Sequence, residues 1–274
     1  MRQPGGGVAG NDGRRSGTVR PELKVLVGDL GIVPARAQGG VARAVLERDG
    51  AVIVPNSGDD PEELVVAAAR LLGGRLRELF GIRAQHGVDA ARLGIHSDGA
   101  NVVVDVHGQH VRLRHPDEDY LLMLCTAPAR EGGDSVLLDG YALVEALRTA
   151  RPELHAFLTG CDVDYFGAWV NPARGVPATP LVRRMVEHTR GGRRAVRASD
   201  YAAPVPREPR WDEHLAFLEE YADVLATAQD CAAAFRMDAG DLLVLDNYRY
   251  LHGRDAYQGE RKLHVLTVRT TDAF

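Results

Sequence analysis

Short apolar runs, bounded by polar turns, recur in the middle and at the end of the chain. Residues 101–106, 120–125 and 135–138 carry such runs, and so do residues 242–245 and 263–268. The last two runs include β-branched side chains, which favour strands. They enclose a polar hinge that contains one histidine. The pattern predicts a core of short strands, closed by two buried strands on either side of this hinge.

Helical spacing of apolar residues marks the start of the chain. The expected elements there are a helix over residues 39–49, a strand over 50–55 and a helix over 61–74. In the first helix Val41, Val45 and Leu46 share one face. The second helix has Pro61 in its first turn, after two aspartates that are suited to N-capping. The opening therefore leads, as helix, strand and helix, into a larger sheet.

Helical spacing returns before the final strands. The expected helices cover residues 141–148, 152–158 and 213–235. The longest of them aligns five apolar residues on one stripe: Leu215, Leu218, Tyr221, Leu225 and Ala228. Between these helices, residues 160–210 are rich in Pro, Gly and Arg and show no clear periodicity.

The order of these elements indicates one α+β domain over residues 21–274 with a helix-rich insertion near 140–235. No internal repeat and no interdomain linker interrupts it. Residues 1–20 are rich in Gly, Arg, Asn and Ser and carry too few apolar side chains to bury enough surface. We expect them to form a disordered tail.

Composition excludes several classes of protein. The net charge of -5 and the pI of about 6.1 argue against a surface built for nucleic-acid polymers. No apolar run reaches the roughly 18 to 20 residues of a membrane span, and the first residues lack the apolar region of a signal peptide. Three scattered cysteines are too few for a disulfide framework. A reduced, cytoplasmic protein is the expectation.

Two histidines and one aspartate are the candidate catalytic residues and metal ligands. His96 and Asp98 are spaced so that both can reach one ion from a strand end, and His252 lies in the polar hinge. Two imidazoles and one carboxylate form the facial triad that suits non-haem Fe(II). The His-x-Asp spacing alone is a weak signal, since His115 and Asp117 repeat it and a lone histidine is more often a core residue.

The segments that follow add specificity. Residues 132–135 read Gly-Gly-Asp-Ser before a strand, and residues 246–254 read Asp-Asn-Tyr-Arg-Tyr-Leu-His-Gly-Arg. Together with the His-x-Asp pair and a downstream arginine, this order resembles the Fe(II)- and 2-oxoglutarate-dependent oxygenases of the taurine dioxygenase and γ-butyrobetaine hydroxylase type. The resemblance covers most of residues 92–270. It implies a double-stranded β-helix core (jelly-roll, cupin-like) with flanking and inserted helices.

The resemblance also implies the cofactors and their contacts. Fe(II) would sit on His96, Asp98 and His252, with 2-oxoglutarate and O2 as cosubstrates. Many family members carry Arg-x-x-x-Arg on the last strand, but Val265 occupies the second place here. Arg261 is therefore the first choice for the distal carboxylate of 2-oxoglutarate, Arg269 is the second, and Ser135 would add a hydroxyl.

Two further features separate this chain from the family pattern or limit its chemistry. The gap between His96 and the Gly-Gly motif is long, so residues 99–119 look like an insertion that forms a lid or a substrate element. The carboxylate of Asp98 is present, whereas related halogenases replace it with Gly or Ala, so hydroxylation is expected. Asp246 is a candidate for ordering a metal-bound imidazole, with a turn role equally open.

A small polar molecule is the expected substrate, such as an amino acid, an amine, a nucleotide or a natural-product intermediate. Candidate contacts come from the 99–119 segment and the insertion: Asn101, Asp105, Tyr165, Trp169, Arg197 and Tyr201. An arginine cluster over residues 183–197 either attracts an anionic substrate or is a solvated face with acidic neighbours. A homo-oligomer is left open.

Three alternatives to hydroxylation are retained. The same iron chemistry can give desaturation, cyclisation or epimerisation. A non-catalytic small-molecule binding protein could have kept the β core, and a zinc hydrolase could use the same triad. Neither the binding protein nor the hydrolase explains the Gly-Gly-Asp-Ser motif and the downstream arginine, so both rank below the oxygenase.

Overall fold

The computed structural model describes residues 21–99, 101–114, 117–169, 176–177 and 180–274. Within them, the helices are α1 (Pro21–Val27), α2 (Gly39–Asp49), α3 (Glu63–Leu72), η1 (Gly73–Arg75), α4 (Gly140–Ala150), α5 (Pro152–Gly160) and α6 (Trp211–Cys231). No described helix is long and apolar enough to cross a membrane.

The larger sheet has seven strands. In order they are β2 (Ala51–Val54), β18 (Leu242–Asp246), β8 (Tyr120–Ala127), β20 (Tyr257–Thr270) and β3 (Leu76–Leu79), and β4 (Arg83–Ala90) and β9 (Glu131–Gly132) also pair with β20. All of these pairings are antiparallel. At 14 residues β20 is the longest strand, and its length lets it hydrogen-bond to four partners.

The second sheet has five strands. Its order is β1 (Gly31–Ile32), β10 (Ser135–Asp139), β19 (Tyr250–Arg254) and β5 (Leu93–His96), with β17 (Ala234–Phe235) also on β10. One buried cluster holds side chains from both sheets, including Leu137 of β10, Tyr250 of β19 and Val265 of β20. The two sheets therefore face each other, and the alternation of side chains along each strand directs every second residue into the space between them.

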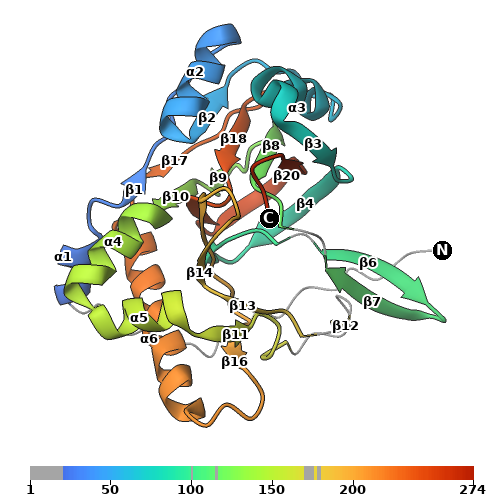
Figure 1. Ribbon diagram of the computed structural model, residues 1–274. Helices are drawn as coiled ribbons and strands as arrows, with labels where there is room; N and C mark the ends of the chain where they lie inside the picture. Colours follow the sequence, from blue (N-terminus) through green and yellow to red (C-terminus); the bar gives the residue numbers. More distant parts are fainter. Residues whose placement is uncertain (1–20, 100, 115–116, 170–175, 178–179) are drawn as a thin grey trace.

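Helices cover the outer face of each sheet (Figure 1). Helices α2 and α3 pack on the larger sheet, where Leu46, Leu64 and Leu266 join one cluster. Helices α1, α4, α5 and α6 pack on the smaller sheet in a cluster that contains Val136 and Leu251. Each sheet is thus buried on both sides, which explains why its central strands read as continuous apolar runs rather than as alternating ones.

The remaining strands form three small sheets outside this core. They are β6 (Asn101–Val106), β7 (Gln109–Arg114) and β12 (Val176–Pro177); β11 (Asp162–Asp164), β13 (Val182–Arg184) and β16 (Ala203–Pro204); and β14 (Val186–His188) with β15 (Arg194–Val196). The β6–β7 hairpin projects away from the body of the molecule (Figure 1). The segment expected to be a lid is thus largely a hairpin, and its role as a lid stays a prediction.

Several predictions from the pattern are confirmed in detail. The helix over residues 39–49 coincides with α2, the strand over 50–55 contains β2, and the five apolar runs all lie in strands. The second expected helix begins two residues late, at Glu63, and its N-cap is Glu62 without a side-chain cap. Asp60 accepts a hydrogen bond from the backbone N–H of Glu62 at 2.9 Å in the turn before it, so the expected capping by an aspartate is not confirmed. Helices α4 and α5 lie where the pattern placed them, and Asp139 caps α4.

Other predictions were wrong in part. Val41 is 64% exposed, and Ala42 takes its place beside Val45 and Leu46 in the core. The long helix ends at Cys231, Leu215 on its stripe is 36% exposed, and Phe235 belongs to a strand. The buried face of each helix is therefore offset from the one that apolar spacing alone suggests.

The polar hinge was also misread. Its second half is β19, which lies in the sheet between β10 and β5. Polar side chains there face the space between the sheets and hide the strand from a hydrophobicity pattern. Strands β3 and β4 and helix α1 had no prediction at all. Most of β4 is exposed, and it is ordered by backbone pairing to β20 rather than by apolar burial.

Candidate metal centre and adjoining pocket

The predicted triad comes together at the open edge of the smaller sheet. His252 in β19 pairs directly with His96 at the end of β5, and their ring centroids lie 4.5 Å apart. Oδ1 of Asp98 lies 3.6 Å from Nε2 of His96 and 3.8 Å from Nε2 of His252. Each of the three residues offers one ligand atom, and these three atoms all lie within 4.8 Å of one another. Two imidazole nitrogens and one carboxylate oxygen thus converge on one point.

Two of the three triad residues, His252 and Asp98, are in the protonation state that suits a metal ion. Burial alone would lower the pKa of His96, but the hydrogen bond and the charge of Asp98 raise it. Burial lowers the pKa of His252 to about 3, with a further contribution from His96, so this imidazole is neutral at pH 7. Burial would raise the pKa of Asp98, but the hydrogen bond from His96 and the charges of His252, His96 and Arg83 outweigh it and hold the pKa below its usual range. An ionised carboxylate and a neutral imidazole are the forms that coordinate a cation.

Asn247 positions the carboxylate ligand, and sequence reasoning did not single it out. Its amide Nδ2 donates to the carbonyl of Asp98 at 2.8 Å, and its Oδ1 accepts the N–H of Asp98 at 3.2 Å. Nδ2 also donates to the carbonyl of Glu118 at 3.0 Å, and the side chain is buried. The sequence marked this residue only as part of the Asp-Asn pair of the motif. The side chain of Asn247 holds the backbone of Asp98 through both its N–H and its carbonyl group.

Arg83 is a second missed neighbour of the triad. Its guanidinium donates to Oδ2 of Asp98 at 3.2 Å, while Oδ1 faces the two histidines. Arg83 pairs in β4 with Val265 of β20, the residue at the second place of the Arg-x-x-x-Arg pattern that the resemblance led us to expect. No hydrophobic or spacing pattern marks it, because β4 was not predicted. The arrangement leaves one carboxylate oxygen for the ion and gives the other a cationic donor.

The outer nitrogens of the two imidazoles differ. Nδ1 of His96 lies 2.9 Å from the carbonyl of Gly94, which fixes the ring with Nε2 toward the triad. Nδ1 of His252 is buried without a hydrogen-bond partner in the described part of the chain. Asp246 does not serve it, since its Oδ1 accepts the N–H groups of Tyr248 and Arg249. The turn role of Asp246 is the one that the structure shows.

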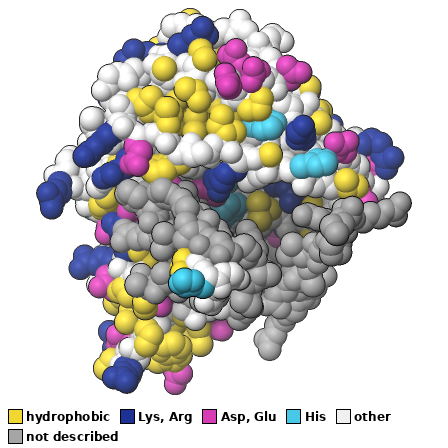
Figure 2. Space-filling model, turned by 90° about the vertical axis from the view of Figure 1, so that its right-hand side faces the viewer, with side chains coloured by type: hydrophobic (Ala, Val, Ile, Leu, Met, Phe, Trp, Pro, Cys, Tyr) yellow, Lys and Arg dark blue, Asp and Glu magenta, His cyan; other side chains and the backbone are white. Residues whose placement is uncertain are grey.

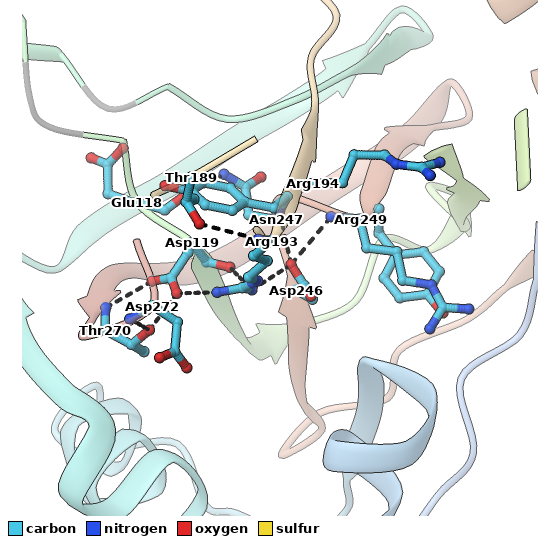
Figure 3. A network of polar contacts seen from close by, with 12 residues as sticks. Glu118, Asp119, Thr189, Arg193, Arg194, Asp246, Asn247, Arg249, Thr270 and Asp272 are labelled. Atoms are coloured by element: carbon cyan, nitrogen blue, oxygen red, sulfur yellow. Dashed lines mark hydrogen bonds and ion pairs between the residues drawn. The ribbon is translucent and has the colours of Figure 1, made fainter. Parts of the chain in front are cut away.

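A buried polar network holds this turn from the other side (Figure 3). Arg193, from the turn between β14 and β15, pairs with both Asp119 and Asp246. Asp119 also accepts the backbone N–H of Thr270 at 2.8 Å, and its carbonyl accepts the N–H of Asn247 at 2.9 Å. The network thus ties the end of β20 and the start of β8 to the residue that clamps Asp98.

A basic pocket adjoins the triad along the space between the sheets. Ser135 of β10 pairs with Arg254 of β19, two residues from His252 on the same face of the sheet. Arg261 of β20 faces the same space, in line with the buried side chains of Leu263 and Val265. Burial lowers the pKa of Arg261, and the charge of Arg254 lowers it further. The predicted Ser135 and Arg261 therefore line one pocket beside the predicted triad.

The Gly-Gly motif shapes this pocket by close approach. Gly132 and Gly133 have φ of 67° and 75°, in the left-handed region that other residues rarely adopt. A Cβ on Gly132 would lie 2.2 Å from the carbonyl oxygen of Ala256, and one on Gly133 would lie 3.4 Å from Cδ of Arg261. The backbone contact with Ala256 requires glycine at position 132, and the left-handed φ favours glycine at both positions.

Comparison with known proteins agrees with this geometry. The sequence profile of the family described as taurine catabolism dioxygenase TauD, TfdA family matches residues 24–267. The chain belongs to the TauD/TfdA family. It is 27% identical over 160 residues to the γ-butyrobetaine dioxygenases of Homo sapiens and Pongo abelii. The match covers 56% of this chain and 39% of each relative, so it spans less than half the length of these relatives.

Solved structures with the same fold confirm the jelly-roll expectation for this TauD/TfdA chain. A structure of AAD-2 in complex with Mn(II) and N-oxalylglycine has a TM-score of 0.58 at 17% identity, covering 86% of this chain and 90% of that one. An asparagine oxygenase with Fe(II), hydroxyasparagine and succinate has a TM-score of 0.55 at 17% identity, covering 84% and 78%. A taurine dioxygenase from Burkholderia xenovorans has a TM-score of 0.54 at 20% identity, covering 85% and 83%.

Arg269, the second choice for binding the distal carboxylate of 2-oxoglutarate, contacts other residues in this TauD/TfdA chain. Its guanidinium donates to the carbonyl of Phe274 and lies 3.8 Å from Glu78. It lies at the far end of β20, eight residues from Arg261, and Phe274 packs on Tyr248. Of the two arginines, only Arg261 lies beside Ser135 and the triad.

The arginine cluster is mostly internal. Arg197 is 8% exposed and pairs with Asp117 and Glu187, and Arg183 pairs with the same two carboxylates. Arg193 lies in the network of Figure 3. A substrate contact by Arg197 is therefore at odds with its position. On the face seen in Figure 2, the described basic and acidic side chains are interspersed, without one broad basic patch.

The aromatic candidates lie near the triad. Trp169 and Tyr201 form an edge-to-face pair with centroids 4.3 Å apart. Residues before Tyr201 are tied to the His96 segment. The N–H and Oγ of Ser97 donate to the carbonyl of Ala198, and the N–H of Ala198 donates to Ser97 Oγ. Tyr165 is buried and belongs to the core. Trp169 and Tyr201 thus stand on a segment that adjoins the metal site.

The remaining candidates cannot be compared with the site. Asn101 and Asp105 lie in β6, where the backbone pairs with Arg114 and His110 of β7, but their side chains lie outside the described part of the structure. His115 of the rival His-x-Asp pair also lies outside it. Its partner Asp117 forms ion pairs with Arg183 and Arg197.

Proposed function

We propose that this protein is an Fe(II)- and 2-oxoglutarate-dependent dioxygenase that hydroxylates an unactivated C–H bond of a small polar molecule. The observation that carries the proposal is the convergence of His96, Asp98 and His252 in a TauD/TfdA fold, next to a pocket that holds Ser135 and Arg261. Two histidines and a carboxylate leave positions open for a chelating cosubstrate and O2.

Each group in the site has a role in this proposal. His96, Asp98 and His252 would hold Fe(II), and Arg261 and Ser135 would hold the distal carboxylate of 2-oxoglutarate through a guanidinium fork and a hydroxyl. The bound metal and cosubstrate would supply the oxidation, with succinate and CO2 as coproducts. Asn247 orients the backbone of Asp98, and the apolar cluster of Leu137, Val265 and their neighbours keeps water from the inner wall.

The similar proteins carry out related chemistry. They include γ-butyrobetaine dioxygenases, a protein bound to Mn(II) and N-oxalylglycine, and an asparagine oxygenase bound to Fe(II), a hydroxylated asparagine and succinate. We infer from them a small-molecule substrate, with Trp169 and Tyr201 among its contacts. Desaturation, cyclisation and epimerisation remain alternatives because they use the same groups. A cytoplasmic location and the oligomeric state stay predictions.

An anaerobic spectroscopic titration tests the proposal. Fe(II) followed by 2-oxoglutarate should produce a weak visible charge-transfer band in the wild-type protein. The His96→Ala variant should lack this band. His86→Ala is the matched control, because His86 is an exposed histidine on β4 that pairs with Glu260. A wild-type protein that binds iron without giving the band would contradict the assignment of 2-oxoglutarate.

A further inference from the structure

Arg254 follows His252 by two residues and shares its face of β19. Strand alternation and the regular pairing with β10 put its side chain beside Ser135 and toward the space between the sheets. Glycine is favoured between them, since a Cβ on Gly253 would lie 3.0 Å from the carbonyl oxygen of Leu93 and from the amide of Gln229. The His-Gly-Arg sequence therefore directs a histidine and an arginine toward the space between the sheets, while the backbone of Gly253 packs closely against β5.

Arg254 and Arg261 approach one aromatic ring. The guanidinium carbons lie 4.6 Å and 5.9 Å from the ring centroid of Tyr257, which is buried. Tyr257 thus lies beside both cations and holds them close to each other. The pKa of each is lowered by burial, and the charge of Arg254 adds to the lowering for Arg261.

Neither guanidinium forms an ion pair within 4.0 Å in the described part of the chain, although the charges of Asp255 and Asp134 act on Arg254 and Arg261 from farther away. Among the described residues, Arg254 donates one hydrogen bond, to the carbonyl of its neighbour Asp255 at 2.8 Å. Most other internal arginines are paired: Arg193 with Asp119 and Asp246, and Arg197 with Asp117 and Glu187. Two neighbouring, partly buried cations without an anion are costly for the free protein, and an anionic ligand between them would remove that cost.

We propose that Arg254 is a second guanidinium of the pocket for the distal carboxylate of the 2-oxo acid, acting together with Arg261 and Ser135. The inference rests on the proposed function, because it concerns that cosubstrate. A pocket with two positive charges selects a 2-oxo dicarboxylate over a 2-oxo monocarboxylate such as pyruvate, which has the same chelating end but no distal charge. Arg254 is in this sense a specificity-determining residue.

Charge-transfer titrations of the iron-loaded protein with 2-oxoglutarate and with pyruvate test it. Arg254→Gln should weaken the binding of 2-oxoglutarate by about 10- to 100-fold, the range for a lost hydrogen bond to a charged group. Its binding of pyruvate should change little. Arg92→Gln is the control for the loss of a neighbouring arginine. Arg92 adjoins Leu93, the β5 partner of Arg254, pairs with Asp230 and lies 3.9 Å from the carboxylate of Asp255.

Thermal unfolding of the metal-free protein separates ligand binding from a structural role. Removing one of two unpaired cations should leave the melting temperature unchanged or raise it, whereas loss of a structural contact to Asp255 would lower it. Equal weakening of both oxo acids, unchanged binding of 2-oxoglutarate, or a lowered melting temperature would overturn the inference. If the wild-type protein gives no band with 2-oxoglutarate, the proposed function fails first. If that band forms and only the Arg254→Gln prediction fails, the proposed function stands.

Discussion

Two basic regions lie within this fold, and they differ in whether their charges are paired. Around Arg193 every charge has a partner: Asp119 and Asp246 accept from the guanidinium, and Thr270 donates to Asp119 (Figure 3). In the pocket of Arg254 and Arg261 no carboxylate from the described residues completes the site. The difference suggests that the first region stabilises the fold and that the second is built for a ligand.

Removing an acid from the paired region should give the largest effect. Asp119→Ala would leave Arg193 with one partner in a buried setting and should lower the free energy of unfolding by about 3–5 kcal/mol. Urea denaturation would measure the loss. Glu47→Ala is the control, since Glu47 forms an exposed pair with Arg43 and its loss should cost less than about 1 kcal/mol. Equal costs would show that the network of Figure 3 contributes no more than a surface pair.

Removing a cation from the unpaired pocket should affect binding instead. Arg261→Ala should weaken the binding of 2-oxoglutarate by about 100-fold, because a charge-assisted contact is lost. The free energy of unfolding should stay within about 0.5 kcal/mol of the wild-type value. Isothermal titration of the iron-loaded protein and urea denaturation give the two numbers. A strongly destabilised Arg261→Ala variant with normal binding of 2-oxoglutarate would show that Arg261 stabilises the fold and does not bind the ligand.

Asn247 links the paired region to the predicted metal triad, because it contacts both Asp98 and the backbone of Asp119. Asn247→Ala should lower Fe(II) affinity or turnover by about 10- to 100-fold, the range for residues that orient a metal ligand. Competition with a metal chelator would measure the affinity. Asn247→Asp is the paired variant, since it keeps the acceptor of the Asp98 N–H and loses only the donors. If Asn247→Ala leaves iron binding intact, the clamp on Asp98 is not needed.

His214 tests whether an unpaired buried group always marks a ligand site. It is 4% exposed in α6, packs on Phe157 with centroids 5.1 Å apart, and neither ring nitrogen has a hydrogen-bond partner within the described structure. His214→Phe should raise the free energy of unfolding by about 1 kcal/mol, because it removes two unsatisfied polar atoms from the core. Activity should not change. A destabilised variant would show that the imidazole makes a contact that matters.

Sequence patterns determined much of this protein. Apolar runs and helical spacing located the central strands and the helices α2 to α6, because those elements bury continuous apolar surface. The spaced residues His96, Asp98 and His252 marked a metal triad, and the Gly-Gly motif and Arg261 marked the pocket beside it. These features are local in sequence, or belong to motifs in which each residue type has one chemical use.

Tertiary structure decided the rest. Strand β4 carries few apolar residues and is ordered by pairing to β20, so the role of Arg83 beside Asp98 had no sequence signal. Whether an arginine forms an ion pair depends on elements distant in the chain. Arg197 pairs with Asp117, 80 positions away, whereas Arg254 forms no ion pair with a carboxylate in the described structure. A sequence shows which side chains can carry charge. Only the packing of the two sheets shows which charges are already neutralised and which remain for a ligand.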